Sequence, residues 1–350
     1  DRPQHLETKM KELKNQKRVT VLGLGETGLA SALFLKRKGY SVFVSDHSAG
    51  VTHASPLQTR AARLKDAQIP FELGSHTFEK IGQSDWVLIS PGIPPSAEIY
   101  QWLCKKEIPK VSEIEVASWF SPGEVIAVTG TSGKSTVVTL VSRMFQANGF
   151  ESIACGNIGN PWIGEIDRLT PETRVVVEVS SFQLLHTGTF RPHVGILLNI
   201  GGNHLDWHSS MEDYVTAKLR LFQNQKLQDF AFIRRKDQES FFPHFPFRSE
   251  VLYFGEKEEG NSNDELLYEM TRLKRLNPDK TREALARFVG LAHRLENVKE
   301  IHGIRFVNDS KCTTLEALVW ALDKFSDGKV ILLAGGHAKG ADFGEVRERL

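Results

Sequence analysis

The chain has 350 residues, of which 40% are hydrophobic and 25% charged, and its formal net charge is +1. This length accommodates roughly two or three ordinary domains, each with its own core. A near-neutral chain has no overall field that would attract nucleic acid or an anionic membrane, so we expect neither as a partner. Its three cysteines lie far apart in the sequence and build no disulfide framework or zinc spacing. With a polar start and no apolar run near ~18 residues, the chain is expected to be cytoplasmic.

The first 120 residues predict an α/β unit built on parallel strands. Short apolar strands alternate with a segment of helical periodicity that stops at Gly39. Such alternation favours a parallel sheet covered on both faces. The predicted elements are a strand over 18–22, a helix over 29–38, and strands over 40–45 and 86–90.

Three glycines in the first turn, Gly23, Gly25 and Gly28, have the Gly-x-Gly-x-x-Gly spacing of a pyrophosphate-binding turn. Asp46 ends the next strand, where such folds place an acid that binds ribose. The pattern leaves three interpretations open: a nicotinamide cofactor, another nucleotide, or glycines that only pack helix against strand. An NAD-dependent oxidoreductase is therefore one alternative function.

A second α/β unit is predicted from about residue 121, where Ser-Pro-Gly marks a boundary. Its later strands are nearly uninterrupted β-branched runs, as expected for central strands of a parallel sheet. The stretch 230–280 mixes aromatic and charged residues and gives no clear assignment. The predicted elements are strands over 125–128, 175–179 and 194–199, and a helix over 137–148.

The sequence from Gly130 to Thr136 reads Gly-Thr-Ser-Gly-Lys-Ser-Thr, between a strand and a helix. The backbone N–H groups of such a turn converge on phosphate oxygens, and the helix N-terminus adds positive potential. Lys134 would reach the β- and γ-phosphates, and Ser135 would ligate Mg²⁺. This is the strongest chemical signal in the chain.

Further polar residues follow the strands of this unit. Glu178 would either hold a metal beside the phosphates or cap the next helix. His204 and His208, with Asp206 between them, lack a third ligand for zinc, so a single ligand to a hard cation or a structural histidine is preferred. Lys218, taken alone, has the pattern of a surface lysine on an amphipathic helix.

A third unit is predicted from residue 291, and because one βαβ unit is too small for a domain, it is expected to be incomplete. Lys311 and Lys339 lie in polar loops at its strand ends, as solvated or as ligand-binding lysines. The predicted elements are a strand over 303–308, a helix over 314–324 and a strand over 329–334.

Eight segments resemble, in chain order, the signatures of the Mur ligases: VTGTSGKST, GNIGNP, EVSSFQL, NHLDWH, AKLR, GLAHRLE, NDSKCTT and LLAGGHAKGADF. The Phe-Gln pair of EVSSFQL is similar to that of the D-glutamate-adding members. The resemblance implies an α/β fold of three domains: an N-terminal Rossmann-like domain over 1–120, a central P-loop ATPase-like domain over 121–290, and an incomplete C-terminal Rossmann-like domain over 291–350.

The resemblance also implies an activity: an ATP-dependent ligase that adds D-glutamate to UDP-N-acetylmuramoyl-L-alanine through an acyl phosphate, in peptidoglycan precursor synthesis. ATP and Mg²⁺, at two sites, would be its cofactors, and the protein is expected to be a monomer. Another Mur-type ligase, a folylpolyglutamate-synthase-like ligase and a non-catalytic nucleotide-binding module remain as alternatives.

The roles of single residues follow from the same resemblance. The residues that the resemblance implies to contact the UDP substrate are Gly25, Thr27, Gly28, Asp46, Ser90, Pro91, Gly92, Asn157, Ser180 and Gln183. The residues that it implies to contact ATP are Gly130, Thr131, Ser132, Gly133, Lys134, Ser135, Thr136, Arg294 and Asp309. The catalytic group is Lys134, Glu178, His204 and Lys218. Metal ligands would be Ser135, Glu178, His204 and a carbamate on Lys218. The incoming amino acid would meet Lys311, Thr313 and Lys339.

Overall fold

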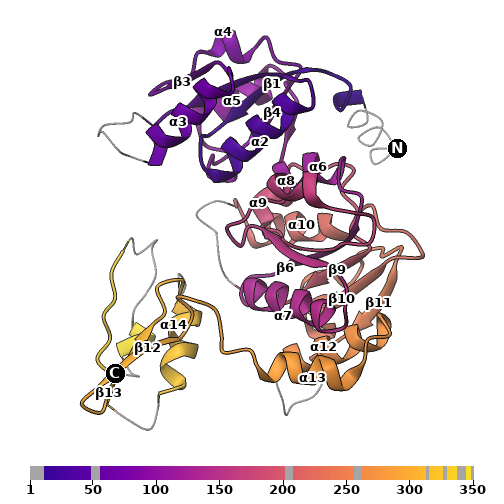
Figure 1. The fold of residues 1–350 in the computed structure, drawn as a ribbon, viewed down its shortest axis with the longest axis vertical. Coiled ribbons are helices and arrows are strands. Elements are labelled where there is room, and N and C mark those ends of the chain that lie inside the picture. Colours follow the sequence, from indigo (N-terminus) through magenta and orange to yellow (C-terminus); the bar gives the residue numbers. More distant parts are fainter. Residues whose placement is uncertain are drawn as a thin grey trace.

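A computed structural model describes residues 12–48, 56–201, 208–255, 262–312, 315–325, 329–336 and 344–347. Two parallel sheets dominate it, and a two-stranded antiparallel sheet follows them in the chain. Figure 1 shows the N-terminal unit at the top, the middle unit below it, and the third unit beside the middle one. Within the described residues, no helix has both the length and the apolar character needed to cross a membrane.

The N-terminal sheet has five parallel strands in the order β3-β2-β1-β4-β5. Its pleat divides the core: Trp86 and Leu88 face α2 and α3, whereas Val87 packs with α4 and α5 on the opposite face. The strands predicted near residues 18, 40 and 86 are confirmed. The elements are β1 (Arg18–Leu22), α2 (Glu26–Arg37), β2 (Ser41–Asp46), α3 (Pro56–Asp66), β3 (Phe71–Leu73), α4 (Phe78–Ile81), β4 (Trp86–Ile89), α5 (Glu98–Lys105) and β5 (Lys110–Val111).

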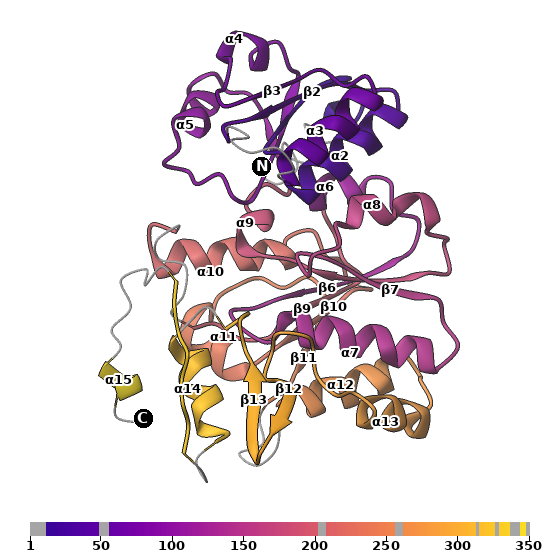
Figure 2. The same cartoon turned by 60° about the vertical axis from the view of Figure 1, so that its left-hand side comes forward.

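The middle sheet has six parallel strands in the order β11-β10-β9-β6-β8-β7, which places β6 between β8 and β9. Figure 2 shows helices on both of its faces, with α7, α12 and α13 on one side and α8, α9 and α10 on the other. Alternate side chains of β6 point to opposite faces of the sheet. Ile126 and Val128 pack with α7, and Val125 and Ala127 belong to the core shared with the N-terminal unit. The predicted strands and helix of this unit are confirmed.

The middle unit also contains the stretch that the sequence left unassigned. Two short strands there, β10 and β11, extend the sheet beyond β9. The elements of this unit are α6 (Glu113–Ser118), β6 (Glu124–Thr129), α7 (Lys134–Ala147), β7 (Ser152–Gly156), α8 (Trp162–Glu165), η1 (Ile166–Arg168), β8 (Arg174–Glu178), α9 (Ser181–Leu184), β9 (Val194–Leu197), α10 (Met211–Leu219), η2 (Arg220–Phe222), β10 (Phe230–Ile233), α11 (Arg235–Phe241), β11 (Glu250–Tyr253), α12 (Ser262–Leu273) and α13 (Pro278–Ala286).

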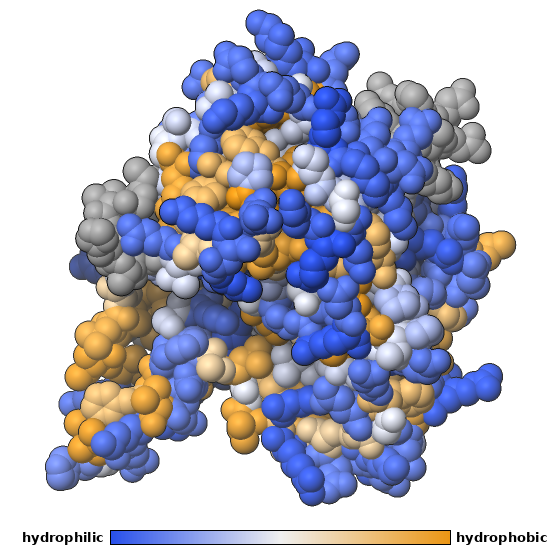
Figure 3. Space-filling model, turned by 45° about the horizontal axis from the view of Figure 1, so that its top comes forward, coloured by the Kyte–Doolittle hydropathy of each residue, from blue (hydrophilic) through white to orange (hydrophobic). Residues whose placement is uncertain are grey.

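The third unit differs from the βαβ unit expected for it. The predicted strand near 303–308 is present as β13 (Ile304–Asn308), but it pairs antiparallel with β12 (Glu296–Ile301). The predicted helix is α14 (Leu315–Asp323), and α15 (Gly344–Arg347) follows. Figure 3 shows apolar side chains at the surface of this part, at the lower left.

The strand predicted over 329–334 is wrong, because these residues adopt no regular structure. Ile331 and Leu333 are 88% and 92% exposed. A strand is stable only when neighbouring backbone takes up its N–H and C=O groups, and no described segment does so here. The apolar pattern of a segment does not show whether another segment pairs with it.

Candidate active site

The turn between β6 and α7 has the geometry expected of a phosphate-binding loop. Gly133 caps α7 with φ of +79°, a left-handed conformation that glycine adopts without strain. At Gly130, with φ of +154°, an added Cβ would lie 3.0 Å from the Cβ of Leu198 in the segment after β9. Glycines at both positions therefore let the turn lie close to that segment and place the positive end of α7 at the carboxyl edge of the sheet.

Two residues that the sequence did not single out fix this turn. The Asn199 Oδ1 accepts hydrogen bonds from the Thr131 and Ser132 N–H groups, at 3.0 and 2.9 Å. The Thr131 hydroxyl is 3.0 Å from the Tyr214 hydroxyl. Asn199 follows β9 at the same edge of the sheet as the turn. Its position after a predicted central strand was the sequence feature that could have indicated a role at the site.

Lys134 and Lys218 meet at this turn. Lys134 Nζ donates to the carbonyl oxygens of Gly130 and Thr131, both at 2.9 Å. Lys218 Nζ donates to the Gly130 carbonyl at 2.8 Å and lies 4.4 Å from the ring centroid of Tyr214. Lys218 is only 1% exposed, so its interpretation as a surface lysine is wrong. The sequence pattern of α10 did not show that the helix face carrying Lys218 packs against the turn.

Burial controls the protonation of both lysines. It lowers the pKa of Lys218 well below the usual lysine value, and the neighbouring cation of Lys134 lowers it further. Burial also lowers the pKa of Lys134; the Glu178 carboxylate opposes that shift and Arg294 adds to it. The site therefore favours one neutral amine beside one cation over two cations.

Glu178 ends β8 and is 3% exposed. Its Oε2 accepts a hydrogen bond from the Ser135 hydroxyl at 2.6 Å, and its Oε1 accepts one from the Asn157 amide at 3.0 Å. Arg294 donates to Ser135 Oγ at 3.2 Å, which brings the start of the third unit to the turn. The alternative role of Glu178 as a helix cap is wrong, because Ser180 caps α9.

The hydroxyl of Ser135 and the carboxylate of Glu178 offer adjacent hard oxygen atoms, and such atoms suit Mg²⁺. Among the described residues no cluster of three or more His, Cys, Asp or Glu side chains could hold a metal. Two protein oxygens still fit Mg²⁺, which commonly keeps waters and takes phosphate oxygens alongside one or two carboxylates. His204, the third predicted ligand, lies outside the described residues.

Ser180 and Gln183 follow Glu178 and form a capping box at the start of α9. The Gln183 Oε1 accepts from the Ser180 N–H and hydroxyl, at 2.9 and 3.0 Å. His208 contacts the same helix: its Nε2 lies 2.9 Å from the Ser181 hydroxyl, and its ring stacks on Phe182. These contacts give His208 a packing role beside the site.

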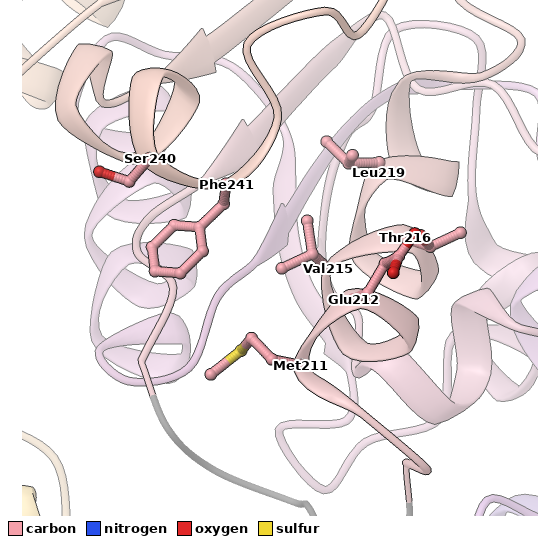
Figure 4. A pocket seen from close by; sticks show the side chains of 7 residues that line it. All are labelled: Met211, Glu212, Val215, Thr216, Leu219, Ser240 and Phe241. Carbon is pink, nitrogen blue, oxygen red and sulfur yellow. The ribbon is translucent and has the colours of Figure 1, made fainter.

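A pocket of about 340 Å³ lies between α10 and α11, beside the helix that carries Lys218 (Figure 4). None of the predicted site residues lines it, since α10 presents a different face there. Its lining residues are Met211, Glu212, Val215, Thr216, Leu219, Ser240 and Phe241.

The N-terminal sheet places its predicted residues around the first glycine turn. The Asp46 carboxylate accepts hydrogen bonds from the Leu24 N–H in that turn and from the Ser48 N–H at 2.7 Å. Across the turn, Ser90 N–H donates to the Leu22 carbonyl, and Gly92 N–H lies 3.4 Å from Ser90 Oγ. Asp46 and the Ser90-Pro91-Gly92 segment thus flank the turn that continues to Thr27 on α2.

The glycines of this turn differ in what surrounds them. An added Cβ at Gly28 would lie 1.9 Å from the Gly23 carbonyl oxygen, so this glycine is required for packing. At Gly25, an added Cβ would meet nothing within 4 Å. Packing therefore explains Gly28, whereas Gly25 leaves room for close approach by a ligand.

The predicted residues of the third unit gather near its hairpin. Asp309 Oδ1 accepts from the Leu295 N–H at 3.0 Å, next to Arg294. The Lys311 N–H donates to the His293 carbonyl at 3.1 Å, and its side chain is exposed. Thr313 and Lys339 lie outside the described residues.

Comparison with known proteins identifies the family. Residues 17–112 match the MurD-like N-terminal domain of Mur ligases, and residues 128–297 match the Mur ligase middle domain. The UDP-N-acetylmuramoylalanine–D-glutamate ligase of Geobacter sp. (strain M21) is 37% identical over 366 residues, covering 95% of this chain and 80% of the relative. The enzyme of the same name from Pelotomaculum thermopropionicum is 35% identical over 370 residues, covering 96% of this chain and 80% of the relative.

The fold agrees with this relationship. The UDP-N-acetylmuramate-alanine ligase MurC from Thermotoga maritima superposes with a TM-score of 0.54 at 17% identity, covering 89% of this chain and 77% of that one. A second superposition, with the UDP-N-acetylmuramate:L-alanyl-gamma-D-glutamyl-meso-diaminopimelate ligase (MPL) from Neisseria meningitides, has a TM-score of 0.52 at 15% identity, covering 79% of this chain and 99% of that one. From its two matched domains and its sequence relatives, this chain belongs to the Mur ligase family.

Proposed function

We propose that this chain is an ATP-dependent ligase that joins D-glutamate to UDP-N-acetylmuramoylalanine, the reaction for which its relatives at 34–37% identity are named. The observation that carries the proposal is the buried lysine at the phosphate-binding turn: Lys218 reaches the Gly130 carbonyl from another helix. A turn that served only to bind a nucleotide would not need a second, fully buried lysine beside Lys134.

The reaction has two steps. A carboxylate oxygen of the alanyl group attacks the γ-phosphorus of ATP, ADP leaves, and an acyl phosphate forms. The amino group of D-glutamate then attacks the carbonyl carbon, loses a proton, and inorganic phosphate leaves as the amide forms. Lys134 and the N-terminus of α7 stabilise the negative charge that moves through the phosphoryl group.

Ser135 and Glu178 would hold Mg²⁺ at this edge of the sheet. When bound, the ion would neutralise phosphate charge and so favour nucleophilic attack. Asn157 and Arg294 hold the two protein oxygens in place, from the turn after β7 and from the third unit. The chain's own contribution is therefore a fixed pair of oxygen donors beside the phosphate-binding turn.

The chemistry of Lys218 supports the carbamate that the family resemblance implies. Only a neutral amine attacks CO₂; the product is a carbamate and a released proton. Burial and the cation of Lys134 hold the pKa of Lys218 well below its usual value, so a larger share of this amine is neutral than in an exposed lysine. The carbamate would replace a positive charge beside Lys134 with a negative one.

The N-terminal site is assigned to the UDP part of the substrate, around Gly25, Asp46 and the Ser90–Gly92 segment. Arg294 and Asp309 are assigned to nucleotide contacts, which the contact between Arg294 and Ser135 supports. Lys311, Thr313 and Lys339 are assigned to the incoming amino acid. Water must be excluded while the acyl phosphate exists, so we propose that the three units close around the substrates during turnover.

Phosphate release from ATP tests the proposal. The chain is assayed with UDP-N-acetylmuramoyl-L-alanine and either D-glutamate, L-glutamate or no amino acid, with the Geobacter sp. (strain M21) relative as a positive control. We expect release that requires both the UDP sugar and the D-isomer. Release that ignores the UDP sugar would contradict this function, as would its absence when the control is active.

A further inference from the structure

Helix α6 joins the N-terminal unit to the middle unit. It begins directly after Ser112, which follows β5, the edge strand of the N-terminal sheet, and it packs against α8 and α9 of the middle unit. Two of its residues, Glu113 and Glu115, are carboxylic acids that are 2% and 0% exposed. Buried acids are costly unless they are hydrogen-bonded, so each must be explained by its partners.

Glu115 is fully satisfied. Its carboxylate accepts from the N–H groups of Gly188, Thr189 and Phe190 at 2.9, 2.8 and 2.9 Å, and from the Trp119 indole at 3.0 Å. These bonds hold the loop between α9 and β9. Glu115 is therefore a structural anchor for that loop.

Glu113 is only partly satisfied. Its Oε1 accepts from the Ile163 N–H at 2.7 Å, whereas its Oε2 is buried without a hydrogen-bond partner. The Cys155 thiol on β7 lies near Glu113, and Glu165 on α8 and Arg168 on η1 lie near the same thiol. Burial raises the pKa of Glu113 to about 7, opposed by the N–H groups of Ile163 and Trp162.

Only Pro161 lies between α8, whose start Glu113 holds, and the turn at 156–160 that carries Asn157. This turn is closed by the Gly156 N–H, which donates to the Asn160 carbonyl at 2.7 Å. Asn157 then contacts Glu178 twice: its N–H donates to the Glu178 carbonyl at 2.9 Å, and its side-chain amide donates to Oε1 at 3.0 Å. Glu113 and Glu178 are thus joined by an unbroken series of contacts.

We propose that Glu113 is a positioning residue of the ligase reaction: from the helix that joins the two units, it fixes the start of α8, and through the turn at 156–160 it sets Asn157 against Glu178. This inference rests on the proposed function. The link between the UDP-substrate unit and the phosphate-transfer site is then a continuous series of hydrogen bonds and short backbone segments.

The charge of Glu113 gives this role a signature. An ionised carboxylate is a stronger acceptor for backbone N–H groups than a neutral carboxyl, so the hold on α8 tightens as Glu113 loses its proton. Glutamine mimics the neutral form and cannot ionise. For Glu113→Gln we expect turnover close to that of the unchanged chain at pH 6 and about 5- to 10-fold lower at pH 8.5, the difference between a charged and a neutral hydrogen bond.

A double-mutant cycle tests whether Glu113 acts through Asn157. Glu113→Gln, Asn157→Ala and the double variant are compared at pH 8.5, with Glu165→Gln as the matched control, a buried carboxyl on α8 that does not bond the Ile163 N–H. We expect the Glu113 substitution to have no further effect in the Asn157→Ala background, and Glu165→Gln to behave like the unchanged chain. Additive effects of the two substitutions, or an equal loss in Glu165→Gln, would overturn the proposal.

Amide hydrogen exchange separates this inference from the proposed function, because it needs no turnover. We expect faster exchange at Asn157 as well as at Ile163 in Glu113→Gln, and no change at either in Glu165→Gln. If the unchanged chain releases no phosphate, the proposed function fails. Exchange then still shows whether Glu113 holds Asn157 in place. If the chain is active but exchange at Asn157 is unchanged in Glu113→Gln, the positioning role fails alone.

Discussion

The side chains of Lys134 and Lys218 donate hydrogen bonds to one oxygen atom, the carbonyl of Gly130, at 2.9 and 2.8 Å. The two residues reach it from different helices, α7 and α10. Two ammonium groups at one carbonyl repel each other, and burial strengthens that repulsion because little water screens it. The arrangement therefore disfavours two charges. Burial and Lys134 both lower the pKa of Lys218, whereas the Glu178 carboxylate opposes the lowering of the Lys134 pKa.

Replacing Lys218 tests what this lysine supplies. Lys218→Ala removes both the amine and any carbamate, whereas Lys218→Arg keeps a cation that cannot react with CO₂. We expect both variants to lose about 10²- to 10³-fold in turnover, the usual cost of removing one group that stabilises a transition state. Phosphate release measured with and without added bicarbonate checks this. An active Lys218→Arg variant would show that the positive charge matters and the carbamate does not.

Lys134 should affect phosphate transfer without affecting the distant UDP site. Lys134→Ala removes the cation at the start of α7, so we expect phosphate release to fall by at least about 10²-fold. Calorimetric titration with the UDP sugar should give an unchanged dissociation constant, because the hydrogen bonds of the Lys134 amine among the described residues go to the Gly130 and Thr131 carbonyls, and neither is a residue assigned to the UDP sugar. Near-normal turnover would contradict the role assigned to this lysine.

Two alanine substitutions in the first glycine turn separate packing from ligand binding. Gly28→Ala places a Cβ 1.9 Å from the Gly23 carbonyl oxygen, so we expect the N-terminal unit to be destabilised by roughly 1–3 kcal/mol. Gly25→Ala meets no protein atom within 4 Å, so its stability should be unchanged while the UDP sugar binds more weakly. Thermal unfolding and titration of both variants measure the two effects. Equal affinity in Gly25→Ala would remove this glycine from the substrate site.

The pH dependence of stability should reveal Glu113. Its pKa is raised from 4.5 to about 7, so its contribution to stability is fully present below pH 4.5 and is lost as pH rises through about 7. The loss is on the order of 3 kcal/mol at alkaline pH. Urea unfolding at pH 5 and pH 8 should therefore show a fall for the unchanged chain that Glu113→Gln lacks. Parallel pH dependences in the two proteins would argue against a buried, titrating Glu113.

His186 should give the opposite pH dependence. It is half-buried near Lys110 and Arg220, and desolvation, with these two cations, lowers its pKa from 6.5 to about 3. The unfolded chain binds this proton more readily, so stability is lost as pH falls below 6.5, by about 2 kcal/mol at pH 5. His186→Phe, which keeps a ring against Tyr100, should remove this loss in urea unfolding between pH 7 and pH 5. An unchanged acid sensitivity would assign it to other groups.

Much of the fold followed from local patterns. The uninterrupted β-branched strands β8 and β9 were predicted as central parallel strands, because strands buried on both faces have no polar side. The Gly130–Thr136 turn was predicted from its spacing, since its glycines are required by backbone geometry wherever the turn occurs. By contrast, β10 and β11 are short, and only pairing makes them strands: β10 pairs with β9, and β11 pairs with β10.

The residues of the site also differ in whether the sequence alone could predict their positions. The sequence by itself determined the phosphate-binding turn and the strand-end position of Glu178, because both are properties of a short, continuous segment. Only the tertiary structure decided that Lys218 is buried against Gly130, that Asn199 and Tyr214 hold the turn, and that residues 329–334 form no strand. Burial, charge interaction and strand pairing each depend on atoms supplied from elsewhere in the chain, and a local pattern contains no record of those neighbours.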